Sequence, residues 1–262
     1  MTRSPAGFTL IELVIAITVL GILAGASVVF MRGPITAYFD AERRSDLADA
    51  GDLALAKLGQ EVAGAVPNSV RVRNAGGSFW LELLPVRSEG RYRTAGTGNP
   101  LTFGTPDNGF DVLGPAVQAA AGDWVVVNNH VALADVWAGT SRATYTGAAG
   151  AVSTVTHATR TFSTDSAEHR FQMASAPVSY VCDPVAGTFS RISNYGDPAA
   201  TQPTAFGAGA QNDLLASGVR RCRAAAFAGS LRRAQTVAVD IGLELNGDRL
   251  NLAQTLRVET LP

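Results

Sequence analysis

Residues Gly7-Phe8-Thr9-Leu10-Ile11-Glu12 begin an apolar run that continues to Met31. Glu12 is the only charged residue of this run, and the 19 residues from Leu13 to Met31 carry no charge. At roughly 1.5 Å per residue, a helix of this length covers most of a ~30 Å hydrocarbon core. A carboxylate at mid-membrane costs about 2.5–3.5 kcal/mol, so it usually has a specific partner. We therefore expect a transmembrane helix over 8–31 in which Glu12 has a dedicated role.

Other interpretations of this segment explain less of it. A secretory signal peptide cleaved near Ala24-Gly25-Ala26 would have an apolar core of about 7–15 residues, which is shorter than this run. A plain membrane anchor gives no reason for Glu12 at its start, and a buried helix of a soluble domain rarely continues this long without charge. Gly21 and Gly25 lie one turn apart and could let helices pack closely in lipid, although glycine is also common in membrane helices.

The helical pattern continues beyond the apolar run. Pro34 should kink or locally break the helix, because proline lacks the backbone donor that a helix interior requires. Apolar residues then recur at helical spacing among many alanines, which favour helix. These residues are Leu47, Leu55, Leu58 and Val62. We expect an amphipathic continuation over 32–66 that ends at Pro67-Asn68-Ser69.

After Pro67 the apolar period becomes that of β-strands. The clearest signal is a C-terminal hairpin, with strands at 236–245 and 250–259 around the turn Asn246-Gly247-Asp248. Residues 89–109 and 194–209 are rich in turn-forming residues and predict loops, while 214–223 could be a short helix or a strand. The fold class is therefore α+β, with one long N-terminal helix packed on a mainly β antiparallel domain over 67–262. Further strands are predicted at 69–73, 78–84, 123–128, 171–173, 178–182 and 188–192.

The chain has two cysteines, Cys182 and Cys222, both far from the apolar run. If this part of the chain lies outside the cytoplasm, a disulfide between them is expected. Two buried free thiols are the alternative. Metal binding by the pair has little support, because neither a CxxC motif nor a nearby histidine pair supplies further ligands.

Composition and motifs give no support for an enzyme. Only 16% of the residues are charged and the formal net charge is −1. No serine lies in a G-x-S-x-G motif, and no phosphate-binding loop is present. The segment Asp107-Asn108-Gly109-Phe110-Asp111 lacks the distal glutamate of a calcium loop. The histidines match no metal or acid–base pattern and are expected on the surface, so we predict no catalytic residue, cofactor or metal. They are His130, His157 and His169.

Two clusters of arginine could in principle contact nucleic acid. Phosphate contacts would make such binding fall steeply with salt. The chain is not basic overall, so solvated faces paired with acids are favoured over nucleic-acid binding. One cluster consists of Arg220, Arg221, Arg223, Arg232 and Arg233, and the other of Arg71, Arg73, Arg87, Arg91 and Arg93.

The Gly7–Phe8 junction, with Glu12 at the fifth position counted from Phe8, resembles the type IV prepilin signal. The resemblance implies that a membrane prepilin peptidase removes a leader of residues 1–7 and methylates the new N-terminal Phe8. It also implies that Glu12 pairs with the N-terminal amine of a neighbouring subunit during assembly.

Later segments resemble a minor-pilin group of mannose-sensitive haemagglutinin pili, which is related to the J-type pseudopilins of type II secretion. The segments are Leu58–Val62, Ala65–Val72 and Pro177–Asp183. This resemblance implies a single-pass inner-membrane protein with its C-terminal domain in the periplasm, later incorporated into an extracellular filament. Its expected partners are the membrane, the prepilin peptidase, other pilin or pseudopilin subunits and an inner-membrane assembly platform. A type II secretion pseudopilin and a pilus-displayed module that binds DNA or a surface ligand remain alternatives.

Overall fold

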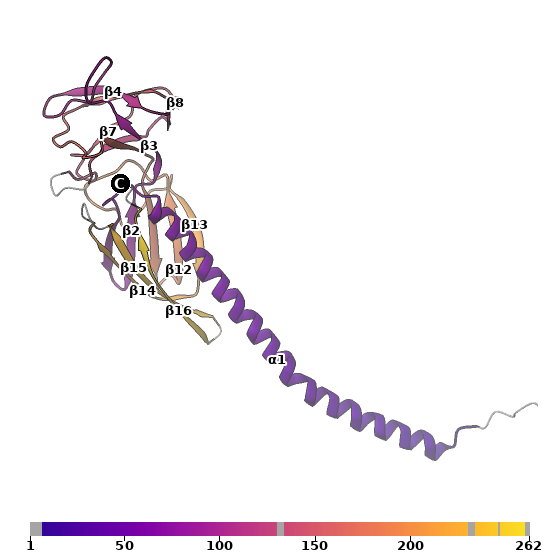
Figure 1. The fold of residues 1–262 in the computed structure, drawn as a ribbon. Coiled ribbons are helices and arrows are strands. Elements are labelled where there is room, and N and C mark those ends of the chain that lie inside the picture. The colour runs from indigo at the N-terminus through magenta and orange to yellow at the C-terminus, as the bar shows by residue number, and fades with distance from the viewer. Residues whose placement is uncertain (1–6, 130–133, 230–233, 246, 260–262) are drawn as a thin grey trace, which may run out of the picture. The chain divides into compact units, whose positions relative to one another are not determined.

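A computed structural model of the chain describes residues 7–129, 134–229, 234–245 and 247–259. The chain divides into two compact units, Met1–Ala48 and Asp49–Pro262, which are described separately. The described part contains one helix, α1 (Leu10–Ala63), whose residues belong to both units (Figure 1). The combination of a long apolar helix with antiparallel sheets confirms the α+β class predicted from the sequence.

The first unit consists of the N-terminal part of α1 and the short segment before it. Every residue from 7 to 39 is exposed in the single chain, including the whole apolar run. By length and composition, α1 could cross a membrane. The helix continues through Pro34, so the local break that proline allows at this position is absent.

The second unit begins with the last turns of α1, which lie against two antiparallel sheets. One sheet has the order β1-β2-β11-β12-β13 and the other the order β14-β15-β16. Leu58 and Val62 of α1 are fully buried. The strands are β1 (Arg71–Ala75), β2 (Ser78–Leu83), β11 (Val178–Asp183), β12 (Thr188–Ser193), β13 (Gln211–Ser217), β14 (Val219–Phe227), β15 (Thr236–Leu245) and β16 (Asp248–Arg257).

Glycines allow α1 to approach the three-stranded sheet closely. A β-carbon at Gly51 would collide with the side chain of Leu252, and one at Gly59 would lie 3.3 Å from Leu256 Cδ2. On the five-stranded sheet, Tyr180 donates a hydrogen bond to the carbonyl oxygen of Lys57. The C-terminal part of α1 therefore contacts both sheets, which together with it form the core of the second unit.

A second set of strands is inserted between β2 and β11. These two strands pair directly, with Leu83 opposite Val178, although about ninety residues separate them in the chain. The inserted strands form a sheet of order β7-β6-β10-β3-β4-β9. They are β3 (Val86–Tyr92), β4 (Asp107–Leu113), β6 (Trp124–Val127), β7 (Arg142–Thr144), β9 (Thr154–Arg160) and β10 (Arg170–Ala174), with β5 (Val117–Ala119) and β8 (Gly150–Val152) as a separate two-stranded ribbon.

The inserted sheet closes on itself. A β-bridge between Tyr145 and His157, and a hydrogen bond from Thr146 N to Thr156 O, join the end of β7 to β9. We call this closed unit, residues 86–129 and 134–174, the inserted barrel. Its own hydrophobic core includes Tyr92, Phe110 and Phe171. In Figure 1 its strands β3, β4, β7 and β8 group apart from β2 and β12–β16.

Most strands predicted from the sequence occur in the structure within a few residues of their expected ends. The loop predicted at 89–109 is wrong in part, because it contains most of β3 and the start of β4. Residues 214–223 are strand, divided between β13 and β14. The hairpin of β15 and β16 is present, while Asn246 of its predicted turn lies outside the described residues.

Candidate assembly site and its supporting domain

Thr9 and Glu12 form a reciprocal hydrogen-bonded pair at the start of α1. The Glu12 Oε2 atom accepts from Thr9 N at 3.3 Å and from Thr9 Oγ1 at 3.1 Å, and Glu12 N donates to Thr9 Oγ1 at 3.3 Å. With Thr9 at the N-cap and Glu12 three residues on, this is a capping box. A carboxylate in the first turn also interacts favourably with the helix dipole. The only acid of the apolar run is thus held against the helix start by its own chain.

The pair gives Thr9 a role that the sequence analysis overlooked. The signal was present, because Thr-x-x-Glu directly before an apolar run is a sequence signature of a helix N-terminus. The adjacent Gly7 and Phe8 precede the helix and are exposed. Residues 1–6 of the predicted leader lie outside the described residues.

Gly21 and Gly25 lie on an open stretch of α1. Within the described residues, no atom would lie within 4 Å of a β-carbon at either position, apart from the helix's own adjacent backbone. No described residue of the chain covers this surface. Close packing of another helix here therefore stays a prediction.

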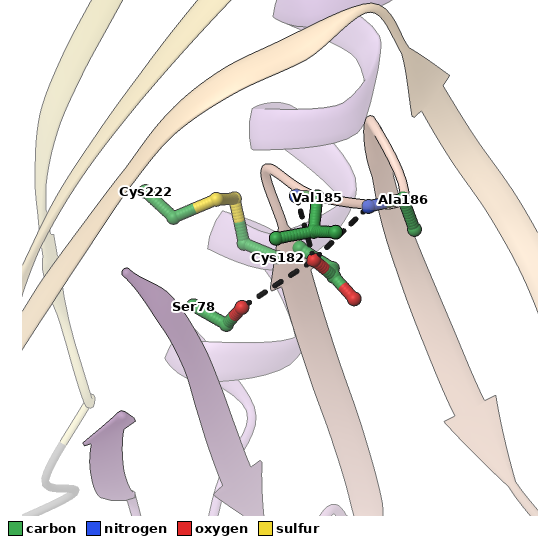
Figure 2. Close-up of a disulfide and its surroundings, with 6 residues drawn as sticks. Ser78, Cys182, Val185, Ala186 and Cys222 are labelled. Carbon is green, nitrogen blue, oxygen red and sulfur yellow. Dashed lines mark hydrogen bonds between the residues drawn. A yellow bond between two sulfur atoms is a disulfide. The ribbon is translucent and has the colours of Figure 1, made fainter. Parts of the chain in front are cut away.

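The predicted disulfide between Cys182 and Cys222 is present (Figure 2). It joins β11 of the five-stranded sheet to β14 of the three-stranded sheet, and both residues are buried. The neighbouring turn is ordered by Asp183, whose Oδ1 accepts hydrogen bonds from Val185 N at 2.8 Å and from Ala186 N at 3.2 Å. The two sheets that contact α1 are thereby linked covalently.

The first arginine cluster is only partly a free basic surface. Arg220, Arg221 and Arg223 lie on β14 and are exposed. Arg221 forms an ion pair with Asp240 of β15 at 2.7 Å, which neutralises part of the surface. Arg232 and Arg233 lie outside the described residues.

The second arginine cluster consists mainly of ion pairs. Arg71 pairs with Glu82 at 2.6 Å and Arg87 with Asp123 at 2.7 Å. Within the described residues, Arg73 is exposed and has no such pair. The other two arginines also have acidic partners, Glu168 for Arg91 at 3.4 Å and Asp111 for Arg93 at 3.5 Å.

One of the three histidines is buried, contrary to the expectation that all three lie on the surface. His157 is 3% exposed and lies in the inserted barrel between Phe110 and Phe162, with ring centroids 6.0 and 5.7 Å away. The bridge that closes the barrel carries this residue into the interior. His169 is partly exposed beside Asp165, and His130 lies outside the described residues. Within the described residues, no group of three or more His, Cys, Asp or Glu could hold a metal ion.

Comparison with known proteins places a family motif on the same segment. Residues 2–28 match the model of the prokaryotic N-terminal methylation motif. No curated protein and no solved structure matched the chain. The motif and the long apolar helix support a type IV pilin-like protein, and imply processing by a prepilin peptidase and assembly with other pilins.

Proposed function

We propose that this chain is a minor pilin of a type IV pilus of the mannose-sensitive haemagglutinin kind, made as an inner-membrane prepilin. The observation that carries the proposal is the N-terminal part of α1, which is apolar, fully exposed and has one carboxylate in its first turn. A surface of this kind needs lipid before assembly and other helices afterwards, because water solvates it poorly.

Assembly in this proposal begins with cleavage between Gly7 and Phe8. The new N-terminal amine is methylated and carries a positive charge. The helix then leaves the membrane and enters a bundle of like helices, where Glu12 pairs with the amine of a neighbouring subunit. Pairing offsets the cost of taking both charges into an apolar core. The chain is a substrate of the peptidase and a structural subunit, and it acts as no enzyme itself.

Thr9 supports the role of Glu12 in this mechanism. Its hydroxyl and amide both donate to the Glu12 carboxylate and so keep the carboxylate at the end of the helix where the amine of a neighbour would arrive. A carboxylate has room for further hydrogen bonds when two donors are already bound. The intramolecular pair is therefore compatible with the intermolecular one.

The second unit is the part that this proposal places in the periplasm and later on the filament surface. The Cys182–Cys222 disulfide supports that location, because such bonds persist in oxidising compartments. A pseudopilin of a type II secretion system would share all of these features. Detection of the protein in purified pili or in a secretion pseudopilus would decide between the two.

The experiment that tests the proposal compares Glu12→Ala with Glu42→Ala, an exposed acid on the same helix. Both variants should be cleaved normally. Glu12→Ala should stay in the membrane fraction, whereas Glu42→Ala should appear in sheared filaments at the level of the unmodified chain. Filament levels of Glu12→Ala equal to those of the control would contradict the assembly role.

A second candidate function is a filament-displayed site for DNA or another anionic ligand on β14. It is favoured by Arg220 and Arg223, which are exposed and have no acidic partner among the described residues. Binding of duplex DNA by the chain should then weaken steeply with salt and be lost in Arg220→Ala/Arg223→Ala. Unchanged binding in that variant would exclude this surface as the site.

A further inference from the structure

The inserted barrel is connected to the rest of the second unit by two chain crossings. The chain leaves the five-stranded sheet at Leu84 and returns after Ala174. Backbone hydrogen bonds fix both crossings, from Val66 N to Leu84 O at 2.8 Å and from Ser175 N to Pro85 O at 2.9 Å. Buried apolar side chains also pack across this boundary, with Val66 and Leu84 in one cluster with Trp124 and Val126 of the barrel, so the crossings are not the only contacts that orient it.

A segment from a distant part of the chain supplies such contacts. We call residues 194–202 the strap. All of its residues are described, and they form no helix or strand. Side chains of the five-stranded sheet hold it instead: Arg71 donates to Ala200 O at 2.7 Å and to Ala199 O at 2.8 Å. Gln202 of the strap donates to Trp80 O at 2.9 Å.

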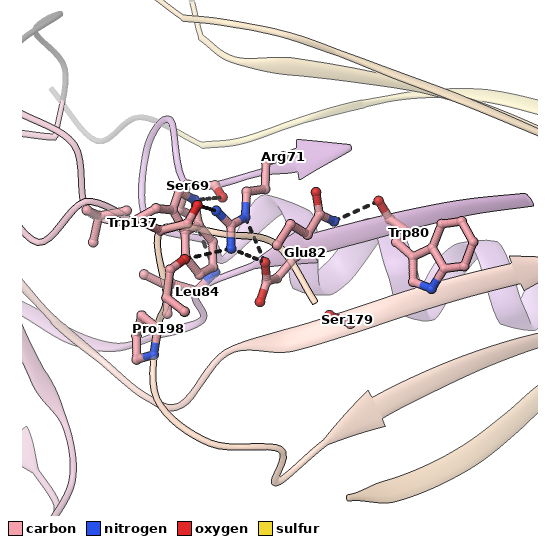
Figure 3. A network of polar contacts seen from close by, with 12 residues as sticks. Ser69, Arg71, Trp80, Glu82, Leu84, Trp137, Ser179 and Pro198 are labelled. Atoms are coloured by element: carbon pink, nitrogen blue, oxygen red, sulfur yellow. Dashed lines mark hydrogen bonds and ion pairs between the residues drawn. The ribbon is translucent and has the colours of Figure 1, made fainter. Parts of the chain in front are cut away.

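Arg71 lies at the centre of these contacts (Figure 3). Its Nε atom donates to Glu82 Oε2 at 2.7 Å, and its guanidinium lies 3.9 Å from the ring centroid of Trp137. Glu82 is 1% exposed and accepts a second hydrogen bond from Tyr195 of the strap at 2.9 Å. Burial raises the pKa of Glu82, while the charge of Arg71 opposes the rise. One guanidinium thus joins a buried acid, an aromatic ring and two strap carbonyls.

The inserted barrel also forms a hydrogen bond to the strap. Arg142 of β7 donates to Pro198 O at 2.6 Å, directly before the two carbonyls that Arg71 binds. The Arg142 guanidinium also lies 4.4 Å from the ring centroid of Trp124 in β6. Consecutive strap carbonyls are therefore bound by arginines from two different sheets.

Trp137 connects the inserted barrel directly to the rest of the second unit, independently of the strap. It lies in the loop between β6 and β7 and donates from Nε1 to Ser69 O at 2.9 Å. Its ring is the face on which Arg71 stacks. An arginine stacked on an aromatic ring gains more than charge pairing alone, and its planar donors fix direction as well as distance.

We propose that the strap is a latch that fixes the orientation of the inserted barrel on the five-stranded sheet, with Arg71 as the positioning residue at its centre. When the latch is closed, the barrel and the sheets that contact α1 move as one body. The latch consists of contacts within one chain and does not depend on the proposed filament role.

The test uses the full chain in detergent and compares Arg71→Ala with Arg73→Ala. Both arginines lie on β1, but Arg73 is exposed and has no ion pair among the described residues. Limited digestion with elastase, which cuts after alanine, should cleave Arg71→Ala after Ala199 and Ala200 roughly tenfold faster than the unmodified chain. Arg73→Ala should match the unmodified chain. Arg71→Lys should fall between them, because lysine keeps the charge beside Glu82 but lacks the planar donors.

A second measurement asks whether the barrel itself is released. Spin labels at Gln60→Cys on α1 and Thr159→Cys on β9, both exposed, report the separation of the barrel from the rest of the second unit. The distance distribution should be narrow in the unmodified chain and in Arg73→Ala, and broader in Arg71→Ala. A strap that is cleaved faster while the distances stay narrow would overturn the latch, as would cleavage equal to that of the control.

General unfolding is distinguished by where the cleavage falls. Loss of the latch confines new cleavage to the strap, whereas unfolding opens sites throughout the barrel and α1. If Arg71→Ala unfolds, Tyr195→Phe replaces it, because that change removes only the hydroxyl bound to Glu82. Tyr195→Phe should then give a smaller increase in cleavage that is confined to the strap, and no increase would overturn the proposal.

Discussion

Replacing Cys182 and Cys222 together with alanine should lower the free energy of unfolding of the second unit by about 5 kcal/mol. The disulfide spans 40 residues of sequence, and the chain-entropy relation for a loop of this length gives roughly 4 kcal/mol at 25 °C. Both side chains are buried, so the lost sulfur atoms add a packing cost of about 1 kcal/mol. For a unit of this size, each kcal/mol corresponds to about 2–4 °C in the melting temperature, so the melting temperature should fall by about 10–20 °C.

The assay is thermal unfolding of the purified chain in detergent, followed by near-ultraviolet circular dichroism. That signal comes from aromatic side chains, most of which lie in the second unit. Chemical reduction of the disulfide in the unmodified chain should reproduce most of the fall in melting temperature. Reduction alters no side-chain volume other than that of the sulfur pair. A loss below about 1 kcal/mol in both experiments would refute the reasoning, because packing alone would then hold the two sheets together.

Three further changes test separate parts of the structure. Gly51→Val should destabilise the second unit by about 1–3 kcal/mol in urea unfolding, because its β-carbon would collide with Leu252. The control Gly64→Ala meets no such obstacle and should be close to neutral, so equal stabilities of the two variants would contradict the close approach of α1. Burial holds the pKa of Glu82 above its ordinary value of 4.5, so the free energy of unfolding should rise as the pH falls through that raised pKa. Glu82→Gln should lack this rise, and identical profiles of unfolding free energy against pH for the two chains would contradict the prediction. Thr9→Val should increase amide exchange at the start of α1 by about fivefold, from the loss of a cap of about 1 kcal/mol, and unchanged exchange in detergent micelles would argue against the capping box.

The parts of the fold that the sequence predicted well are those set by local patterns. The apolar run and the leucines at helical spacing predict α1, and alternation on both sides of Asn246-Gly247 predicts the pairing of β15 with β16. In the structure this pairing runs without a shift from Thr236 opposite Arg257 to Leu245 opposite Asp248. Neighbouring strands joined by a short turn need no information from elsewhere in the chain.

The inserted barrel could not be predicted in this way. Strand β3 pairs with β10, and Arg91 lies opposite Arg170, almost eighty residues later. The start of β4 is rich in turn-forming residues, so its local pattern favours a loop, and pairing with β9 overrides that preference. His157 is buried because it lies on the inward-facing side of β9, opposite Tyr145 at the point where the barrel closes.

The candidate sites also differ in how well local sequence predicts them. The Gly7–Phe8 junction and Glu12 are contiguous in the sequence and matched a known motif, whereas the latch at Arg71 combines residues from five separate segments. Glu82 was the available signal, since a carboxylate within an otherwise apolar strand requires a buried partner. For the arginine clusters the sequence favoured faces paired with acids, but partners such as Asp123 for Arg87 lie far along the chain, so local pattern could not name them.

Mass spectrometry of the mature N-terminus, with the protein isolated from membranes, is the most direct test of the pilin-like account. Cleavage after Gly7 with methylation predicts a peptide that begins with N-methylated Phe8. A peptide that begins at Met1 or near Ala26 would contradict the account and leave an anchored or secreted domain without a filament role.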